Sequence, residues 1–189
     1  MITPPSAQAA VQFAEAALQV LATRAEFRAA LCGGPSLTGM LAALHGLPAF
    51  HRIDWRGVQI FAVDDGWDEP SSQALSGLPL PRGHVHRPRS ADISPVDSAR
   101  HYEHTLRTQF GLQAGELPVF DWVLLAAEAA AYEGLAGDAA HLVVAQPRVM
   151  LSRAVLQAAA QVFSPSTAKS SGAATPPTGR PMRSGLSPR

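Results

Sequence analysis

Residues 27–45 read FRAALCGGPSLTGMLAALH, and this stretch is the most informative part of the sequence about the fold class. It begins with a short apolar run that stops at Gly33 and Gly34, a pattern that predicts a buried strand ending in a turn. Small and hydroxyl-bearing residues follow, and a helix is expected from about residue 38 to 45, closed by Gly46. The stretch therefore predicts a strand, a glycine turn and a helix in direct succession.

The same alternation continues on both sides of this stretch. Helical spacing of apolar residues predicts a helix before it, over about residues 6–21. Further strands are expected at 58–63, 119–125 and 141–145, with a short one within 84–89, helices at 94–110 and near the end of 148–163, and a loop at 70–83. Strands that alternate with helices predict one α/β domain, with a mostly parallel sheet covered by helices on both faces.

Composition is that of an ordinary globular interior. The 189 residues suffice for one domain, the formal net charge is zero, and 47% of the residues are hydrophobic. Such a balance argues against a nucleic-acid-binding protein. Cys32 is the single cysteine, so neither an internal disulfide nor a thiolate metal site is expected. No apolar run is long enough to span a bilayer, and a cytoplasmic location is the prediction.

Composition changes near residue 164. Residues 164–189 contain five prolines, four basic residues and no acidic residue, which predicts a disordered tail. Residues 1–163 form the predicted domain and carry 11 basic and 15 acidic residues, so this part is mildly acidic. The tail is interpreted as solvated, with contact to an anionic surface as the alternative.

The glycine turn is a candidate anion site. Ligands of parallel sheets bind outside the carboxyl ends of the strands. Glycines there let backbone N–H groups approach a phosphate, and the N-terminus of the next helix adds unsatisfied donors and a positive dipole end. Ser36 and Thr38 offer hydroxyl groups beside Gly33 and Gly34. The alternative is that the two glycines form only a tight turn.

A second loop carries four carboxylates. Residues 63–70 read VDDGWDEP and place Asp64, Asp65, Asp68 and Glu69 after the next strand. Such groups accept hydrogen bonds from sugar hydroxyls, act as acid or base, or hold a hard cation. The alternative is a solvated turn with side-chain caps.

We expect no cofactor. His84 and His86 recur at strand spacing, but no third metal ligand is near them in the sequence, which favours a surface strand. The glycines do not form the dinucleotide-binding fingerprint, because the next glycine after Gly34 is Gly39 and no acidic residue stands at a credible ribose position. The sequence thus implies neither a nucleotide nor an obligatory metal.

Five stretches follow one another in the chain: LCGGPSLTGMLAAL, WRGVQIFAVDDGW, HVHRPRSADISPVDSARHYEHTLRTQF, PVFDWVLL and PRVMLSRAVLQAAAQV. In this order and approximate spacing they resemble the 6-phosphogluconolactonase family over roughly residues 7–163. The resemblance implies a Rossmann-like sheet, a small-molecule sugar phosphate as partner, and hydrolysis of 6-phospho-D-glucono-1,5-lactone to 6-phosphogluconate in the pentose phosphate pathway. Family members carry another strand and helix after the last stretch, so this domain is expected to be truncated at its C-terminal end.

The resemblance also implies a set of binding residues. The family turn Ser-Gly-Gly-Ser-Thr-Pro corresponds to residues 32–37, so Gly33, Gly34 and Ser36 are expected to hold the substrate phosphate. Pro35 replaces a residue with both an N–H and a hydroxyl, which weakens the expected cradle. Arg148 matches an arginine that the family uses near the phosphate.

The family's acidic loop, Asp-Glu-Arg, corresponds here to Asp64, Asp65 and Gly66. Both carboxylates are kept and are expected to contact sugar hydroxyls or water. The arginine, which would supply fixed positive charge, is replaced by glycine.

The largest departure lies in residues 124–137, which read LLAAEAAAYEGLAG. The family has a glycine-rich motif here whose histidine is the expected general base, and this chain has no histidine in the segment. Asp64, Glu128 and Glu133 are candidate substitutes, because hydrolysis needs a group that takes a proton from water. Two hypotheses stay open: a weakly active lactonase, or an inactive sugar-phosphate-binding or decaying member of the family.

Overall fold

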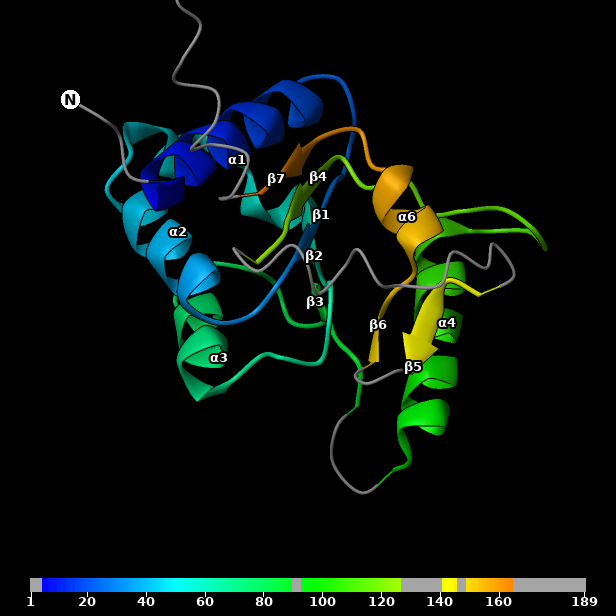
Figure 1. The fold of residues 1–189 in the computed structure, drawn as a ribbon. Helices are drawn as coiled ribbons and strands as arrows, with labels where there is room; N and C mark the ends of the chain where they lie inside the picture. The colour runs from blue at the N-terminus through cyan, green and yellow to red at the C-terminus, as the bar shows by residue number, and fades with distance from the viewer. Residues whose placement is uncertain (1–4, 90–92, 127–140, 146–148, 165–189) are drawn as a thin grey trace, which may run out of the picture.

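A five-stranded sheet forms the centre of the computed structural model, which describes residues 5–89, 93–126, 141–145 and 149–164 (Figure 1). All neighbouring strands are parallel, in the order β3-β2-β1-β4-β7. Their bounds are Val85–His86 (β3), Val58–Ala62 (β2), Phe27–Leu31 (β1), Trp122–Leu124 (β4) and Val162–Phe163 (β7). The predicted parallel α/β class is confirmed.

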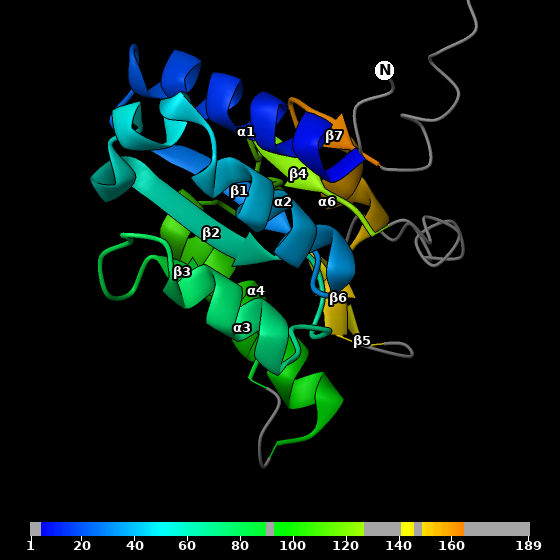
Figure 2. The ribbon, with the colours of Figure 1, turned by 90° about the vertical axis from the view of Figure 1, so that its left-hand side faces the viewer.

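Helices cover both faces of this sheet (Figure 2). The first two, α1 (Pro5–Leu21) and α2 (Pro35–His45), lie together on one face, and α3 (Glu69–Ser76) packs beside α2. The opposite face carries α4 (Pro95–Phe110) and the short α6 (Arg153–Gln157). The expected helices at 6–21, 38–45 and 94–110 are therefore present, and α4 ends as predicted at Gly111, which adopts a left-handed conformation with φ 63°.

Each face of the sheet has its own aromatic cluster, because successive residues of a strand point to opposite sides. Phe13 of α1 meets the rings of Phe27 and Trp122 at 5.3 and 5.4 Å. On the other face, Phe61 meets Phe110 of α4 at 5.3 Å and Phe120 at 5.4 Å. These contacts fix the sheet between its two helical layers.

Residues 70–83 contain α3, where the sequence analysis expected a loop throughout. The Asp68 side chain caps this helix by accepting a hydrogen bond from the backbone N–H of Ser71. Pro70 stands in the first turn, where its missing N–H costs nothing, and Gly77 ends the helix. The prediction was wrong because the proline- and serine-rich composition hid a helix start signal.

Residues 141–145 do not join the parallel sheet. Their strand, β5 (Val143–Ala145), pairs antiparallel with β6 (Val149–Leu151) in a separate two-stranded sheet. This small sheet lies next to α4 and meets the end of β2, where the N–H of Leu151 donates to the carbonyl of Val63 at 2.8 Å. The apolar run predicted a strand correctly, but not its partner.

The last helix is shorter than expected and a strand follows it. The helix α6 ends at Gln157, and Val162 and Phe163 pair with β4 as the fifth strand of the main sheet. The N–H of Leu125 donates to the carbonyl of Phe163 at 2.9 Å. Pairing with the sheet thus outweighs the helix propensity of the intervening alanines. The predicted tail at 165–189 lies outside the described residues, and the domain boundary stays a prediction.

Within the described part of the chain, no helix is long and apolar enough to cross a membrane.

Candidate functional site

The strand order changes direction at β1, since β2 lies on one side of it and β4 on the other. In doubly wound sheets the crevice outside the carboxyl ends at such a point is where ligands bind. A cavity of about 230 Å³ lies here, between the start of α2, the ends of β4 and β7, and the first turns of α1. We call it the switch-point pocket; it is lined by Pro5, Ser6, Ala9, Pro35, Ser36, Leu124 and Phe163.

Both glycines of the turn are required by the local geometry. A Cβ atom on Gly33 would stand 2.2 Å from the carbonyl oxygen of Gly66, so only glycine lets the two loops approach this closely. Gly34 has φ 79° and is the N-cap of α2. The glycine turn and the acidic loop, which lie about thirty residues apart in the sequence, are therefore in direct contact.

Several donors of the turn already have partners within the protein. The Gly34 N–H donates to the hydroxyl of Ser71 at 2.8 Å, and that hydroxyl donates to Asp68. The N–H groups of Leu37 and Thr38 both donate to the carbonyl of Gly34. Of the predicted phosphate donors, the one that the structure places on the switch-point pocket is Ser36.

Ser36 is half-buried, and neither its backbone N–H nor its hydroxyl bonds to any residue that the structure describes. It stands in the first turn of α2, where the dipole end is positive. Pro35 beside it has no N–H to offer. Ser36 thus supplies two donors at the point where an anion would meet the helix.

The two carboxylates of the acidic loop have structural roles in this state. Asp64 accepts a hydrogen bond from the N–H of Gly66 at 2.9 Å and forms an isolated antiparallel bridge with Met150. Asp65 exchanges two hydrogen bonds with Val149: its N–H donates to the carbonyl at 2.9 Å, and its carboxylate accepts from the N–H at 3.2 Å. The β5–β6 hairpin therefore holds this loop in place.

Asp64 also acts electrostatically on two buried neighbours. Burial raises the pKa of the Cys32 thiol to about 12, and the charge of Asp64 adds to the rise. The pKa of Tyr102 is raised well above its ordinary value by burial first and by Asp64 as well, although its hydroxyl donates to the carbonyl of Ala62 at 2.7 Å. Cys32 is consequently a neutral thiol at neutral pH and does not serve as a nucleophile.

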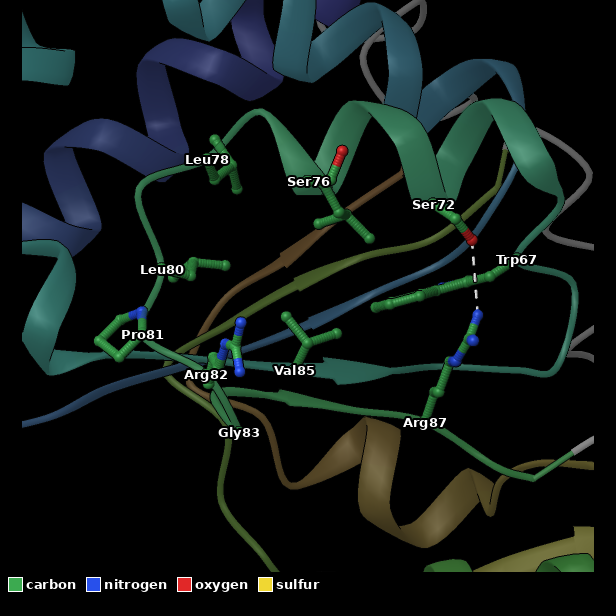
Figure 3. Close-up of a pocket in the computed structure, with 11 residues that line it drawn as sticks. Trp67, Ser72, Ser76, Leu78, Leu80, Pro81, Arg82, Gly83, Val85 and Arg87 are labelled. Carbon is green, nitrogen blue, oxygen red and sulfur yellow. Dashed lines mark hydrogen bonds between the residues drawn. The ribbon is translucent and has the colours of Figure 1, made fainter.

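Two residues that support the site were missed by the sequence analysis. Trp67 donates from its indole nitrogen to the carbonyl of Leu31 at 3.0 Å and lies between α3 and the sheet, where it lines a groove of about 410 Å³ (Figure 3). Ser71 is fully buried and links the glycine turn to Asp68. Asp68 followed by Pro70 was the available signal, because aspartate is a preferred N-cap and proline is common in the first turn of a helix.

Glu128, Glu133 and Arg148 lie outside the described residues, so the structure does not place them. His84, just before β3, and His86, within it, both contact residues of β2 at the edge of the sheet. A ring nitrogen of His84 lies 2.9 Å from the carbonyl of Val58, and one of His86 lies 3.0 Å from the side-chain oxygen of Gln59. Among the described residues no cluster of histidine, cysteine and carboxylate side chains is arranged to hold a metal ion.

These features define a doubly wound α/β protein with a candidate anion site at the switch point of its sheet. The sequence model of the glucosamine-6-phosphate isomerases/6-phosphogluconolactonase family matches residues 5–127, which is more than half of the chain. The chain belongs to this family, as its resemblance predicted.

Individual relatives are distant. A 6-phosphogluconolactonase from Synechocystis is 28% identical over 117 residues, a match that covers 57% of this chain and 47% of the relative. The chain thus spans about half the length of that curated relative.

Solved structures show the same fold. The 6-phosphogluconolactonase from Thermotoga maritima superposes with a TM-score of 0.68 at 16% identity, covering 86% of this chain and 79% of that one. The enzyme from Trypanosoma cruzi gives 0.67 at 20% identity, with coverages of 86% and 76%.

Proposed function

We propose that this protein binds 6-phospho-D-glucono-1,5-lactone at the switch-point pocket and hydrolyses it slowly to 6-phosphogluconate, a reaction of the pentose phosphate pathway. The observation that carries the proposal is Ser36, whose N–H and hydroxyl have no partner among the described residues and stand at the positive end of α2, on a cavity at the switch point. Family membership supplies the substrate class.

Binding of the phosphate is assigned to the glycine turn. Each hydrogen bond to a charged acceptor contributes about 1.5–3 kcal/mol, so the two donors of Ser36 and the helix dipole give a weak but specific site. Gly33 and Gly34 let the ligand approach the backbone. An additional donor becomes available if the Gly34 N–H exchanges its hydrogen bond with Ser71 for one with the ligand. Arg148 is proposed to add positive charge; its neighbour Val149 is bound to Asp65.

Hydrolysis requires a general base. Water attacks the lactone carbonyl carbon, the base takes a proton from the water, the bond from that carbon to the ring oxygen breaks, and the ring oxygen receives a proton. Asp64 is the candidate that the structure describes, at the carboxyl end of β2 beside Gly66. Glu128 and Glu133 are the further candidates, in the segment that replaces the family's histidine motif.

The second candidate function is sugar-phosphate binding without catalysis. It is favoured by the absence of a histidine from residues 124–137, which removes the base expected from the family pattern. Both functions require the same phosphate contacts, so binding alone does not separate them.

The test measures binding and turnover with the same protein. Calorimetric titration compares 6-phosphogluconate with gluconate, and proton release from freshly prepared lactone is corrected for spontaneous opening. We expect 6-phosphogluconate to bind and gluconate not to bind, and Ser36→Ala to weaken binding about tenfold, since a charged hydrogen bond is lost.

Ser76→Ala is the matched control, because Ser76 is exposed at the end of α3 and its hydroxyl donates only to the carbonyl of Gln73. Binding without any enzymatic proton release would establish the non-catalytic function. Equal binding of the two sugars, or loss of binding in both serine variants, would contradict the phosphate assignment.

A further inference from the structure

A second pocket, of about 350 Å³, is lined by residues of the edge strand β3, of the segment after it and of α4. The helix α4 covers the sheet face opposite α1 and α2 (Figure 2). We call this cavity the β3–α4 pocket; its charged and imidazole side chains are His86, Arg87, Arg89, His101 and His104. Its volume falls within the range of small-molecule sites. None of the residues of the switch-point pocket takes part in it.

Two arginines make the lining of this pocket positive, although residues 1–163 as a whole are mildly acidic. Three histidines also contribute to the wall, and no aspartate or glutamate does so among the described residues. The acidic side chains of α4 are engaged elsewhere: Asp97 pairs with Arg100 at 3.6 Å, and Glu103 pairs with Arg107 at 2.8 Å. Because residues 1–163 carry an excess of acidic side chains, this concentration of positive groups is local.

Secondary structure brings these groups to one place. His101 and His104 lie three residues apart on α4 and so share one face of the helix. Pro88, which is buried, anchors the segment after β3 between the two exposed arginines. The carbonyl of Arg89 accepts a hydrogen bond from the Ser98 hydroxyl, which ties this segment to the start of α4.

The floor and one wall are rigid. Tyr102 is fully buried, and its hydroxyl is held by the carbonyl of Ala62. The His86 ring stacks on Phe61 with 4.5 Å between centroids and is held by Gln59. Burial, with a smaller effect of His84, keeps the pKa of His86 below its ordinary value, so this ring is a fixed neutral wall.

Arg89, His101 and His104 are the groups available to a ligand. Arg89 forms no ion pair with any residue in the described ranges. Arg87 reaches toward the neighbouring groove instead, where it donates to Ser72 at 3.4 Å (Figure 3). The planar fork of a guanidinium matches phosphate oxygens in geometry and charge, and imidazole N–H groups add donors.

We propose that the β3–α4 pocket binds a small phosphorylated anion, at a site separate from the switch-point pocket. Arg89 contacts the phosphoryl oxygens, His101 and His104 donate to them from α4, and the walls exclude water from one side. This proposal does not depend on hydrolysis at the switch point.

The probe is inorganic pyrophosphate, added at constant ionic strength to the full chain while the imidazole signals of its seven histidines are followed by NMR. We expect saturable shifts for His86, His101 and His104, and none for His45, at the end of α2, or for His51, in the segment that follows it. Citrate, a carboxylate anion, is expected to bind at least tenfold more weakly. Equal binding of citrate would overturn the phosphoryl assignment, and uniform or absent shifts would overturn the site.

Variants distinguish binding in the β3–α4 pocket from a general effect of positive charge on the protein. Arg89→Gln and the double variant His101→Gln/His104→Gln are each expected to weaken pyrophosphate binding at least tenfold with an unchanged melting temperature. Arg100→Gln is the control, because it removes one charge from the same helix at a side chain that is 77% exposed and outside the pocket. Ser36→Ala is expected to leave these shifts unchanged. An equal loss in the control, or full binding in both test variants, would contradict the proposal.

Discussion

The switch-point pocket and the β3–α4 pocket offer an anion two different kinds of attraction. The described lining of the first has no charged side chain, so its attraction comes from the backbone, the Ser36 hydroxyl and the end of α2. The second depends on arginine and histidine side chains. Backbone donors demand an exact loop geometry, whereas side-chain charges tolerate small shifts. The first pocket should thus be sensitive to loop packing, and the second to charge and salt.

The largest expected effect concerns chemistry at the switch point. A missing general base lowers a rate by about 10² to 10⁴, so turnover of the lactone should be slower by that factor than in a family member with the histidine motif. Proton release measures it. If a carboxylate acts as the general base instead, one of the substitutions Asp64→Asn, Glu128→Gln and Glu133→Gln should abolish the remaining turnover. A rate equal to that of an intact lactonase, unchanged in all three variants, would mean that the base lies elsewhere.

The next effect is on stability and tests the loop geometry. Gly33→Ala should destabilise the protein by about 3 kcal/mol, because its Cβ would meet the Gly66 carbonyl at 2.2 Å and force the two loops apart. Urea unfolding measures this, and binding of 6-phosphogluconate should be lost while the β3–α4 pocket still binds pyrophosphate. Gly46→Ala is the control, since its Cβ meets its nearest neighbour at 3.4 Å and its φ is −79°.

A smaller loss of stability is expected when Ser71, which links the glycine turn to Asp68, is replaced. Ser71→Ala should cost about 1–2 kcal/mol, because the part-buried Gly34 N–H loses its acceptor and Asp68 loses a donor. Unfolding of the variant is compared with that of Ser76→Ala, which should lie within about 0.5 kcal/mol of the parent. Equal stability of both variants would show that the link does not hold the turn.

The same link predicts a pH dependence. The hydrogen bonds from the Ser71 side chain and backbone lower the pKa of Asp68. A carboxyl group whose pKa is lowered in the folded state stabilises the protein at pH values above its ordinary pKa of about 4. This stabilisation is lost as the pH falls through the pKa of the folded state. The stability difference between the parent and Ser71→Ala should therefore narrow below about pH 4. A difference that stays constant from pH 7 to pH 3 would contradict this origin.

The smallest effect distinguishes the two pockets directly. Raising the salt concentration screens exposed charges more strongly than partly buried backbone donors. Pyrophosphate binding at the β3–α4 pocket should weaken several-fold between 50 mM and 300 mM salt, as an order-of-magnitude expectation, and phosphate-dependent binding at Ser36 should weaken less. NMR signals of His101 and of the Ser36 amide report the two sites in one titration. An equal dependence of the two binding affinities on salt concentration would contradict the proposed difference between the pockets.

Strands and helices with local signals could be predicted from the amino-acid sequence alone. The apolar run before Gly33 predicted β1, Gly111 predicted the end of α4, and the alternation of elements predicted the parallel sheet. The sequence also identified the family. The position of Gly33, Gly34 and Ser36 directly after a strand predicted a candidate site, which stays a prediction. Periodicity, caps and turn residues act within a few positions of the chain, and this makes them readable without a structure.

Strand pairing and the partners of the hydrogen-bond donors became known from the three-dimensional fold. Residues 141–145 form a strand outside the main sheet, while Val162 and Phe163 leave the expected helix to join it. Likewise, the Gly34 N–H is taken by Ser71, thirty-seven positions away, and Arg89 meets His101 and His104 across a pocket. Such outcomes depend on competition between partners distant in the chain, and no local pattern records which contact has the lower free energy.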